Sequence, residues 1–126
     1  WTLLAVLALL FVLPGRSDAI TWQGPAAVTW YGPGFYGHTF ACAYTRPGLP
    51  VKYRYNVRGV AVNAAFARCG RYMTLKYKGR TIHVRVIDRC PGCDTRYHPF
   101  DLTQRSMADL TGGGHYTLHG VRWHRG

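Results

Sequence analysis

Acidic side chains are scarce in this sequence, so any carboxylate chemistry depends on very few residues. The 126-residue chain has sixteen Lys and Arg but only five acidic residues, all of them Asp, and it contains no Glu. Asp88 ends an apolar, β-branched stretch, and Asp101 stands just before a predicted helix. Asp94 and Asp109 are expected to be solvated, one in a loop and one on the helix. Asp18 lies in a predicted signal peptide.

A carboxyl group with apolar neighbours is suited to donating a proton. Val86 and Ile87 precede Asp88, and we expect them to desolvate it and favour its neutral form. Cleavage of a glycosidic bond needs a proton donor for the leaving oxygen, and hydrolysis adds a second carboxylate. Asp88 is therefore the candidate acid, and Asp101 is the candidate second carboxylate or an anchor beside the helix. Two structural alternatives stay open: an ion pair of Asp88 with Arg89 or another of the many arginines, and capping of the helix by Asp101.

Aromatic side chains stand in loops and strand ends near these two aspartates. Binding sites for small molecules and sugars combine aromatic faces with a few polar groups that fix orientation. The candidates for contacting a sugar are Trp30, Tyr31 and Tyr97, and the alternative for each is a place in the core. His98 is a candidate for contacting the sugar or orienting Asp101, with a plain surface position as its alternative.

The four cysteines predict two disulfides, because an even count in a secreted chain indicates oxidised pairs. The expected pairs are Cys42–Cys69 and Cys90–Cys93, and the other pairings stay open because the sequence does not choose among them. The Cys90-x-x-Cys93 spacing would also suit zinc or a redox dithiol. A second cysteine pair at zinc spacing and a thioredoxin-like context are both missing, which argues against each. No metal or other cofactor is expected.

The N-terminal residues have the pattern of a signal peptide. Residues 2–13 form an apolar run, too short for the roughly 20 residues that cross a bilayer and typical of a signal-peptide core. Ser17-Asp18-Ala19 supplies the small-x-small pattern of a cleavage site, so we expect cleavage after Ala19. The alternative is a retained anchor helix. The processed protein is expected to be extracellular or in the cell wall, without a membrane span.

The net charge of +11 predicts anionic surroundings. For an exported protein these are anionic wall polymers or phospholipid headgroups. Specific nucleic-acid binding is not expected, because no segment resembles an element that reads a nucleic-acid groove. The alternative is that the basic residues only keep the protein soluble.

Short β-strands separated by Gly and Pro turns predict a mainly β fold with closed edges. The turn at residues 78–80 predicts a hairpin. A helical turn is expected over residues 63–67, and a helix over 103–110 that Thr103 caps and the glycines at 112–114 end. The strands are expected at residues 27–31, 57–62, 72–77, 81–87 and 116–123. A lead-in at 20–27 would then precede one domain at 28–126.

Two sequence blocks resemble the double-psi β-barrel of RlpA-like proteins, expansins and family-45 endoglucanases. The first is TWYGPG at residues 29–34 followed by TFAC at 39–42, which is similar to the opening of RlpA-like domains. The second is VRVIDRCPGC at 84–93 followed by FDLT at 100–103, which resembles expansins and the barwin-like plant natriuretic peptides. RCG at 68–70 is similar to the place where these families put a bridged cysteine beside glycine.

The resemblance implies a six-stranded barrel with one or two short helices and a groove crossed by a glycan. In the relatives, the positions of Asp88 and Asp101 lie at that groove, and those of Thr29 and Tyr31 lie beside it. His98 and Asp101 belong to a segment that is similar to the His-Phe-Asp of expansins with a proline inserted.

The departures from the family pattern leave two functions open. Ala64 stands where lytic RlpA-like enzymes carry a His, and their Glu has no counterpart here. The first function is a peptidoglycan lytic transglycosylase that uses Asp88 as acid and then base. The second is a non-catalytic, expansin-like protein that binds and loosens wall glycan. The second domains of expansins and RlpA-like proteins are not seen, so we expect a barrel by itself. We also expect a monomer.

Overall fold

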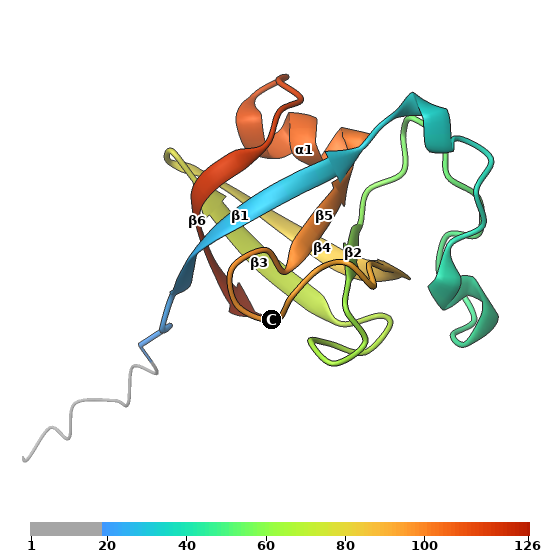
Figure 1. Ribbon diagram of the computed structural model, residues 1–126, viewed down its shortest axis with the longest axis horizontal. Coiled ribbons are helices and arrows are strands. Elements are labelled where there is room, and N and C mark those ends of the chain that lie inside the picture. The colour runs from blue at the N-terminus through green and yellow to red at the C-terminus, as the bar shows by residue number, and fades with distance from the viewer. Residues whose placement is uncertain (1–18) are drawn as a thin grey trace, which may run out of the picture.

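The structure, a computed structural model, describes residues 19–126 and consists of one closed barrel with a short helix (Figure 1). The signal peptide expected at residues 1–19 lies outside the described residues except for Ala19. The barrel order is β1-β5-β2-β4-β3-β6. Its strands are β1 Gln23–Tyr31, β2 Val60–Val62, β3 Tyr72–Tyr77, β4 Arg80–Arg89, β5 Phe100–Thr103 and β6 Leu118–Arg125. The predicted mainly β, six-stranded barrel is therefore confirmed.

Each strand pairs with two neighbours, so the barrel has no open edge. β2 lies between β4, which it pairs in parallel, and β5, which it pairs antiparallel. β1 pairs in parallel with β5 and antiparallel with β6. The predicted β3–β4 hairpin is present, with Lys78 at φ 43° and Gly79 at φ 79°. Two positive φ angles in a two-residue loop match the twist of the flanking strands.

The helix begins and ends where its capping residues predict. α1 spans Gln104–Thr111, and the Thr103 side chain accepts a hydrogen bond from the backbone N–H of Ser106. Gly112 ends the helix at φ 81°, a left-handed conformation that suits glycine. Met107 and Leu110 are fully buried, and the helix packs against β3, β4 and β5.

Several strand bounds differ from the predictions, and one strand was not predicted. β4 extends to Arg80–Arg89, and β6 is shifted to Leu118–Arg125. β1 begins at Gln23 rather than residue 27, because residues 23–26 pair with β6, so most of the expected lead-in is strand. β2 is confined to Val60–Val62. β5 was not predicted as a strand, because its short apolar-polar alternation, Phe100 to Thr103, was interpreted as the segment that opens the helix. Residues 63–66 form a hydrogen-bonded turn, as expected for the 63–67 segment.

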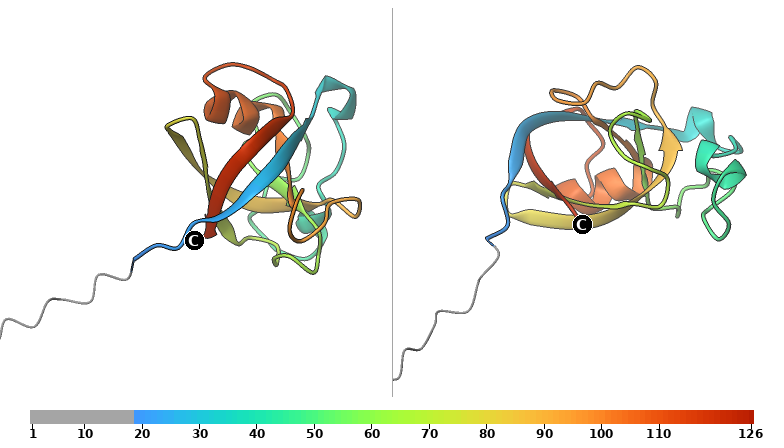
Figure 2. Two further views of the ribbon diagram at one scale, coloured as in Figure 1. Left: turned by 60° about the vertical axis from the view of Figure 1, so that its left-hand side comes forward. Right: turned by 90° about the horizontal axis from the view of Figure 1, so that it is seen from below.

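A long excursion, residues 32–59, leaves the end of β1 and returns at the start of β2 (Figures 1 and 2). It contains two 3₁₀ turns, Pro33–Phe35 and Ala41–Tyr44. Phe40 and Tyr53 are fully buried, and the Tyr53 ring lies 4.8 Å from the ring of Tyr31. The excursion therefore has its own small core, which covers the end of β1.

The disulfides are Cys42–Cys69, which ties the excursion to the barrel, and Cys90–Cys93, which closes a tight loop after β4. Both expected pairs are formed, so no thiolate is available to zinc or to dithiol chemistry. Within residues 19–126, no group of three potential ligands could hold a metal ion. No helix in this range is long and apolar enough to cross a membrane.

Gly59, at the end of the excursion, is a sensitive packing position. A Cβ built there would lie 2.3 Å from Cδ1 and 2.5 Å from Cγ1 of the buried Ile87. We expect Gly59→Ala to lower the free energy of unfolding by about 1–3 kcal/mol, the usual cost of overpacking a core. Denaturant unfolding measures this. Gly34→Ala is the control, because nothing lies within 4 Å of its Cβ and its φ is ordinary; equal stability of the two variants would contradict the prediction.

Candidate functional site

The candidate site is a row of four residues across four adjacent strands. Thr29 on β1 pairs with Asp101 on β5. Asp101 pairs with Ala61 on β2, and Ala61 also pairs with Asp88 on β4. Residues in register on neighbouring strands project to the same face of a sheet. We call this set, Thr29, Asp101, Ala61 and Asp88, the aspartate row. The two aspartates lie two strand spacings apart, so their Cα atoms are separated by about 10 Å.

A register shift brings Asp88 into this row. Val60 pairs with Val86, but the next residue, Ala61, pairs with Asp88 rather than Ile87. β4 therefore carries one extra residue here, which is a β-bulge. Bulges re-aim side chains and occur often beside functional sites. Without the shift, Asp88 would share the inward face of Val84 and Val86 and could not lie in register with Ala61.

The carboxylate of Asp88 is nearly closed off from solvent and is held by the excursion. Asp88 is 5% exposed. Its Oδ1 accepts a hydrogen bond of 2.8 Å from the backbone N–H of Ala41, and its Oδ2 lies 3.6 Å from Nε2 of His38. Arg89 does not pair with it, because the Arg89 guanidinium donates to the carbonyl of Ala67. No arginine among residues 19–126 forms an ion pair with Asp88, so the alternative of an arginine pair is wrong.

Asp101 belongs to a second polar group that includes Thr29 and His98. The Thr29 hydroxyl donates to Oδ1 of Asp101 over 3.1 Å, and Nε2 of His98 lies 2.7 Å from the same hydroxyl. Burial raises the pKa of Asp101 above its usual value, with a further contribution from the negative charge of Asp88, and outweighs the hydrogen bond from Thr29. Capping of the helix by Asp101 is wrong, because Thr103 performs it.

Tyr31 lies beside both carboxylates. Its hydroxyl is buried and has no hydrogen-bond partner within the described residues. Burial, followed by the charges of Asp88 and Asp101, raises the pKa of the Tyr31 phenol far above its usual value. The phenol thus remains a proton donor at every physiological pH. A buried donor without a partner beside two carboxylates is the kind of exception that marks functional sites.

Two of the predicted sugar contacts do not join this group. Trp30 is on the opposite face of β1 from Thr29 and Tyr31, and its ring lies 5.0 Å from that of His115. Tyr97 is 65% exposed in the loop after β4, with Arg96 over its ring. The structure therefore brings together Thr29, Tyr31, Asp88, Asp101 and His98, and it leaves Trp30 and Tyr97 outside the direct contacts of the row.

The structure adds contacts from the excursion: those of His38 and Ala41 were not predicted, while Phe35 and Tyr36 were considered as aromatic candidates near the site but not chosen. His38 and the backbone N–H of Ala41 face Asp88. The exposed rings of Phe35 and Tyr36 stand next to the buried pair Tyr31 and Tyr53. His38 directly precedes the TFAC block, which is a signal in the sequence, but its contact depends on how the excursion folds back.

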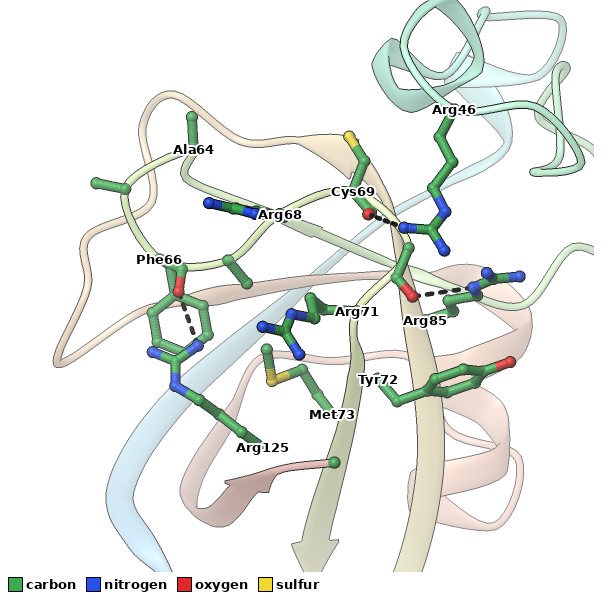
Figure 3. A pocket seen from close by; sticks show the side chains of 14 residues that line it. Arg46, Ala64, Phe66, Arg68, Cys69, Arg71, Tyr72, Met73, Arg85 and Arg125 are labelled. Atoms are coloured by element: carbon green, nitrogen blue, oxygen red, sulfur yellow. Dashed lines mark hydrogen bonds between the residues drawn. The ribbon is translucent and has the colours of Figure 1, made fainter.

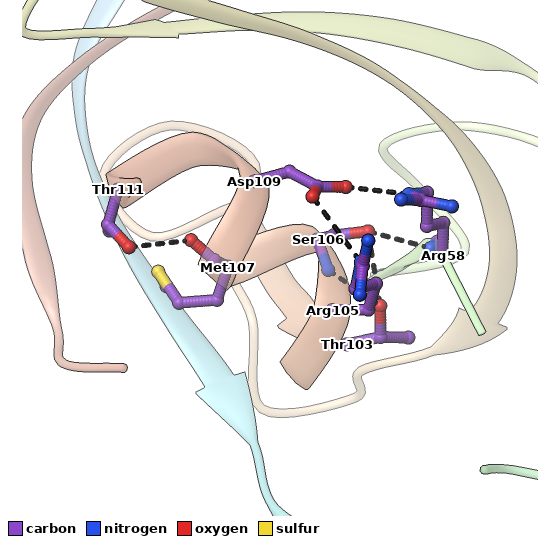
Figure 4. A network of polar contacts seen from close by, with 8 residues as sticks. Arg58, Thr103, Arg105, Ser106, Met107, Asp109 and Thr111 are labelled. Carbon is purple, nitrogen blue, oxygen red and sulfur yellow. Dashed lines mark hydrogen bonds and ion pairs between the residues drawn. The ribbon is translucent and has the colours of Figure 1, made fainter. Parts of the chain in front are cut away.

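The other two aspartates of the barrel also make structural contacts: Asp94 is solvent-exposed, as expected, and Asp109 is only partly exposed. Oδ1 of Asp94 accepts the backbone N–H groups of Arg96, Tyr97 and His98, and these bonds lower the pKa of Asp94. Asp109 pairs with Arg58 at 2.6 Å and with Arg105 at 3.5 Å, as Figure 4 shows. Asp94 thereby shapes the loop that carries His98, and Asp109 joins α1 to the excursion.

The raised pKa of Asp101 predicts a pH-dependent effect on stability. A carboxyl whose pKa is higher in the folded state than in the unfolded state has no effect on the free energy of unfolding at a pH below both values. As the pH rises through the two values, this carboxyl lowers the free energy of unfolding. Asp101→Asn removes this cost and keeps an oxygen that can accept from Thr29. We therefore expect the Tm difference, variant minus wild type, to grow from about pH 3 to about pH 7. A difference that shrinks over this range would contradict the assignment.

Comparisons with known proteins find barrels of similar fold. No family model matches the chain. The chain is 41% identical over 54 residues to a papain inhibitor of Streptomyces mobaraensis, a match that covers 43% of this chain and 36% of that protein. The structure of a Streptomyces papain inhibitor is similar with a TM-score of 0.57 and 28% identity, covering 82% of this chain and 92% of that one.

Expansin structures from Clavibacter michiganensis are similar as well. The apo form has a TM-score of 0.55 and 22% identity over 80% of this chain and 48% of the expansin. A mutant in complex with cellohexaose has a TM-score of 0.55 and 20% identity over 84% of this chain and 50% of the expansin. The chain thus spans about half the length of these expansins. The barrel of this chain has the expansin-like, double-psi β-barrel fold, which it shares with the Streptomyces inhibitor.

Proposed function

We propose that this protein is extracellular and binds a cell-wall polysaccharide, peptidoglycan or another wall glycan, along the aspartate row. The observation that carries the proposal is the register that sets Thr29, Asp101 and Asp88 in one line across β1, β5, β2 and β4. The structural similarity to an expansin in complex with cellohexaose supports a linear glycan as the ligand class. The two disulfides and the predicted signal peptide support the extracellular location.

The row offers a sugar both acceptors and donors. The Asp88 and Asp101 carboxylates accept from sugar hydroxyls, while Thr29 and His98 provide polar contacts beside them. The small side chain of Ala61 separates the two aspartates. The exposed rings of Phe35 and Tyr36 provide apolar faces at the adjacent edge of the excursion. This combination of a few fixed polar groups and aromatic faces is typical of sugar sites.

The same row supports cleavage of the bound glycan by a lytic transglycosylase. This reaction needs one carboxylic acid that protonates the leaving oxygen and then, as carboxylate, accepts a proton from the sugar hydroxyl that attacks the anomeric carbon. Asp101 is better placed to serve than Asp88, because it is less buried and its raised pKa favours a neutral, proton-donating form. Asp88 would then hold the substrate or share the proton transfer, which modifies the assignment of Asp88 as the principal acid.

The test is mass spectrometry of soluble products after incubation with purified peptidoglycan, peptide-free glycan strands and cellulose. Products with 1,6-anhydro ends, absent with Asp88→Asn and Asp101→Asn, would establish lytic transglycosylation. Ordinary reducing ends would establish hydrolysis by the two aspartates. Binding to the wall material without products would establish the non-catalytic, expansin-like function. Neither binding nor products would overturn the proposal.

Inhibition of a papain-type cysteine protease is the second candidate function. The observation that favours it is the similarity to the Streptomyces papain inhibitor, which covers 92% of that chain, together with the 41% identity over 54 residues. The test is to add increasing amounts of the protein to papain of known active-site concentration and to measure the remaining protease activity. Stoichiometric inhibition by a protein that shows no wall binding would replace the first proposal. Full papain activity in excess protein would remove the second.

A further inference from the structure

A groove of about 1020 Å³ opens on the described surface, and none of the aspartate-row residues lines it (Figure 3). It lies between the 64–73 segment, the middle of β4 and the end of β6. Five of the sixteen basic residues of the chain line it. These residues define the arginine groove: Arg46, Arg68, Arg71, Arg85 and Arg125.

Three of these arginines are held by the backbone of the same segment. Arg85 donates through Nε to the carbonyl of Gly70 over 3.0 Å, and Arg125 donates through Nη1 to the carbonyl of Phe66 over 2.7 Å. Arg46 donates to the carbonyl of Cys69 over 3.4 Å. A guanidinium has five N–H donors, so each of these bonds orients the group and leaves most donors for a ligand.

The other two arginines are without partners among residues 19–126. The side chains of Arg68 and Arg71 make no hydrogen bond or ion pair there, and Figure 3 shows Arg71 between Arg85 and Arg125. No acidic side chain lines the groove. In the described part of the chain, Asp88 and Asp109 make the ion pairs, and both lie outside it. Five like charges gathered in one concave surface raise the local concentration of anions.

The two aromatic rings that line the groove each contact other side chains, which bears on the kind of anion that fits there. Tyr72 is stacked on His83 with centroids 4.8 Å apart, and Arg85 lies 5.3 Å from its centroid. Phe66 packs against Trp123, and Arg125 lies 4.5 Å from its centroid. Proteins that bind single-stranded nucleic acid need free aromatic faces on which bases stack. The arginine groove therefore fits an anionic chain that is recognised by charge rather than by stacking.

We propose that the arginine groove binds the carboxylate or phosphodiester groups of an anionic wall polymer, at a site separate from the aspartate row. The volume of the groove exceeds that of most small-molecule pockets, which reach about 1000 Å³. Its five guanidinium groups come from several segments of the chain. A polymer with repeated charges therefore fits the groove better than one small anion. Planar guanidinium groups bind carboxylate and phosphate in the same bidentate manner. The groove would retain the protein in an anionic wall whatever the row binds.

Equilibrium binding to two soluble probes, polygalacturonate and poly(glycerol phosphate), tests the site and distinguishes its two anion sources. The groove variant is Arg68→Gln with Arg71→Gln. The matched control, Arg80→Gln with Arg122→Gln, removes the same charge from exposed positions outside the groove. We expect the wild type to bind at least one probe, the groove variant to bind it about tenfold more weakly, and the control to stay within about threefold of the wild type.

Three results would overturn the inference. Equal losses in both double variants would mean that the affinity comes from the overall charge. Absence of binding to either probe at low salt would remove the site. Tighter binding of single-stranded DNA, with the same dependence on Arg68 and Arg71, would make it a nucleic-acid site. If the two sites are separate, the Asp88→Asn variant binds the anionic probes as the wild type does. Failure of the glycan proposal for the aspartate row can therefore be distinguished from failure of the proposal for the arginine groove.

Discussion

Asp88→Asn is expected to weaken binding to wall glycan about 10- to 100-fold, the size of a lost hydrogen bond to a charged group. The physical reason is that Asp88 lies in register with Ala61, which in turn lies in register with Asp101, so that both carboxylates belong to the proposed glycan site. Asn keeps an oxygen that can accept the backbone N–H of Ala41, so the excursion stays in place. Co-sedimentation with purified wall material measures binding, and thermal unfolding measures the fold.

Asp109→Asn is the matched control for this variant. It removes the same charge from α1, where Asp109 pairs with Arg58 and Arg105 and not with the row. We expect the control to bind as the wild type does and to lose some stability instead. Wild-type binding by Asp88→Asn, with normal unfolding, would mean that the row is not the glycan site.

Removal of the Cys42–Cys69 disulfide is expected to cost the most stability. The bridge spans a sequence separation of 27, and the loop-entropy relation gives about 3.5 kcal/mol for such a closure. The Cys90–Cys93 bridge, with a separation of 3, gives about 2 kcal/mol by the same relation. Replacing each pair by serines and measuring denaturant unfolding under equal conditions compares the two.

Loss of Cys42–Cys69 is also expected to weaken glycan binding. Cys42 directly follows Ala41, whose backbone N–H holds Asp88, so release of the excursion removes that donor and the nearby His38. The Cys90→Ser/Cys93→Ser variant keeps both contacts. An equal loss of stability in the two variants, or full binding without Cys42–Cys69, would contradict this account of the excursion.

Local chemistry predicted the parts of the fold that depend on near neighbours. Gly79 in the hairpin turn, Thr103 as helix cap and Gly112 as helix end all act within a few residues of the chain. The strand β5 was missed because its alternation is only four residues long and runs directly into the helix that Thr103 caps. The pairing of β2 with both β4 and β5 could not follow from local signals, and only the resemblance indicated that Asp88 and Asp101 share a groove.

Strand alternation could have corrected one site prediction. Thr29 and Tyr31 are two residues apart on a strand and face the same side, so Trp30 between them faces the other. The contact of His38 with Asp88 could not be predicted from the sequence, because it depends on how an excursion with little regular structure folds back. The arginine groove could not be predicted from the sequence either. Its arginines are spread from residue 46 to residue 125, and they come close together only in the closed barrel.

The most direct test of the central claim is an NMR titration of the isotope-labelled protein with cellohexaose and with soluble peptidoglycan strand fragments. If the aspartate row is the glycan site, the amide signals of Thr29, Ala61, Asp88 and Asp101 shift in a saturable way with at least one glycan, while those of the arginine groove and of Asp109 stay unchanged. Shifts confined to other surfaces, or none with either glycan at the highest concentration reached, would contradict the claim.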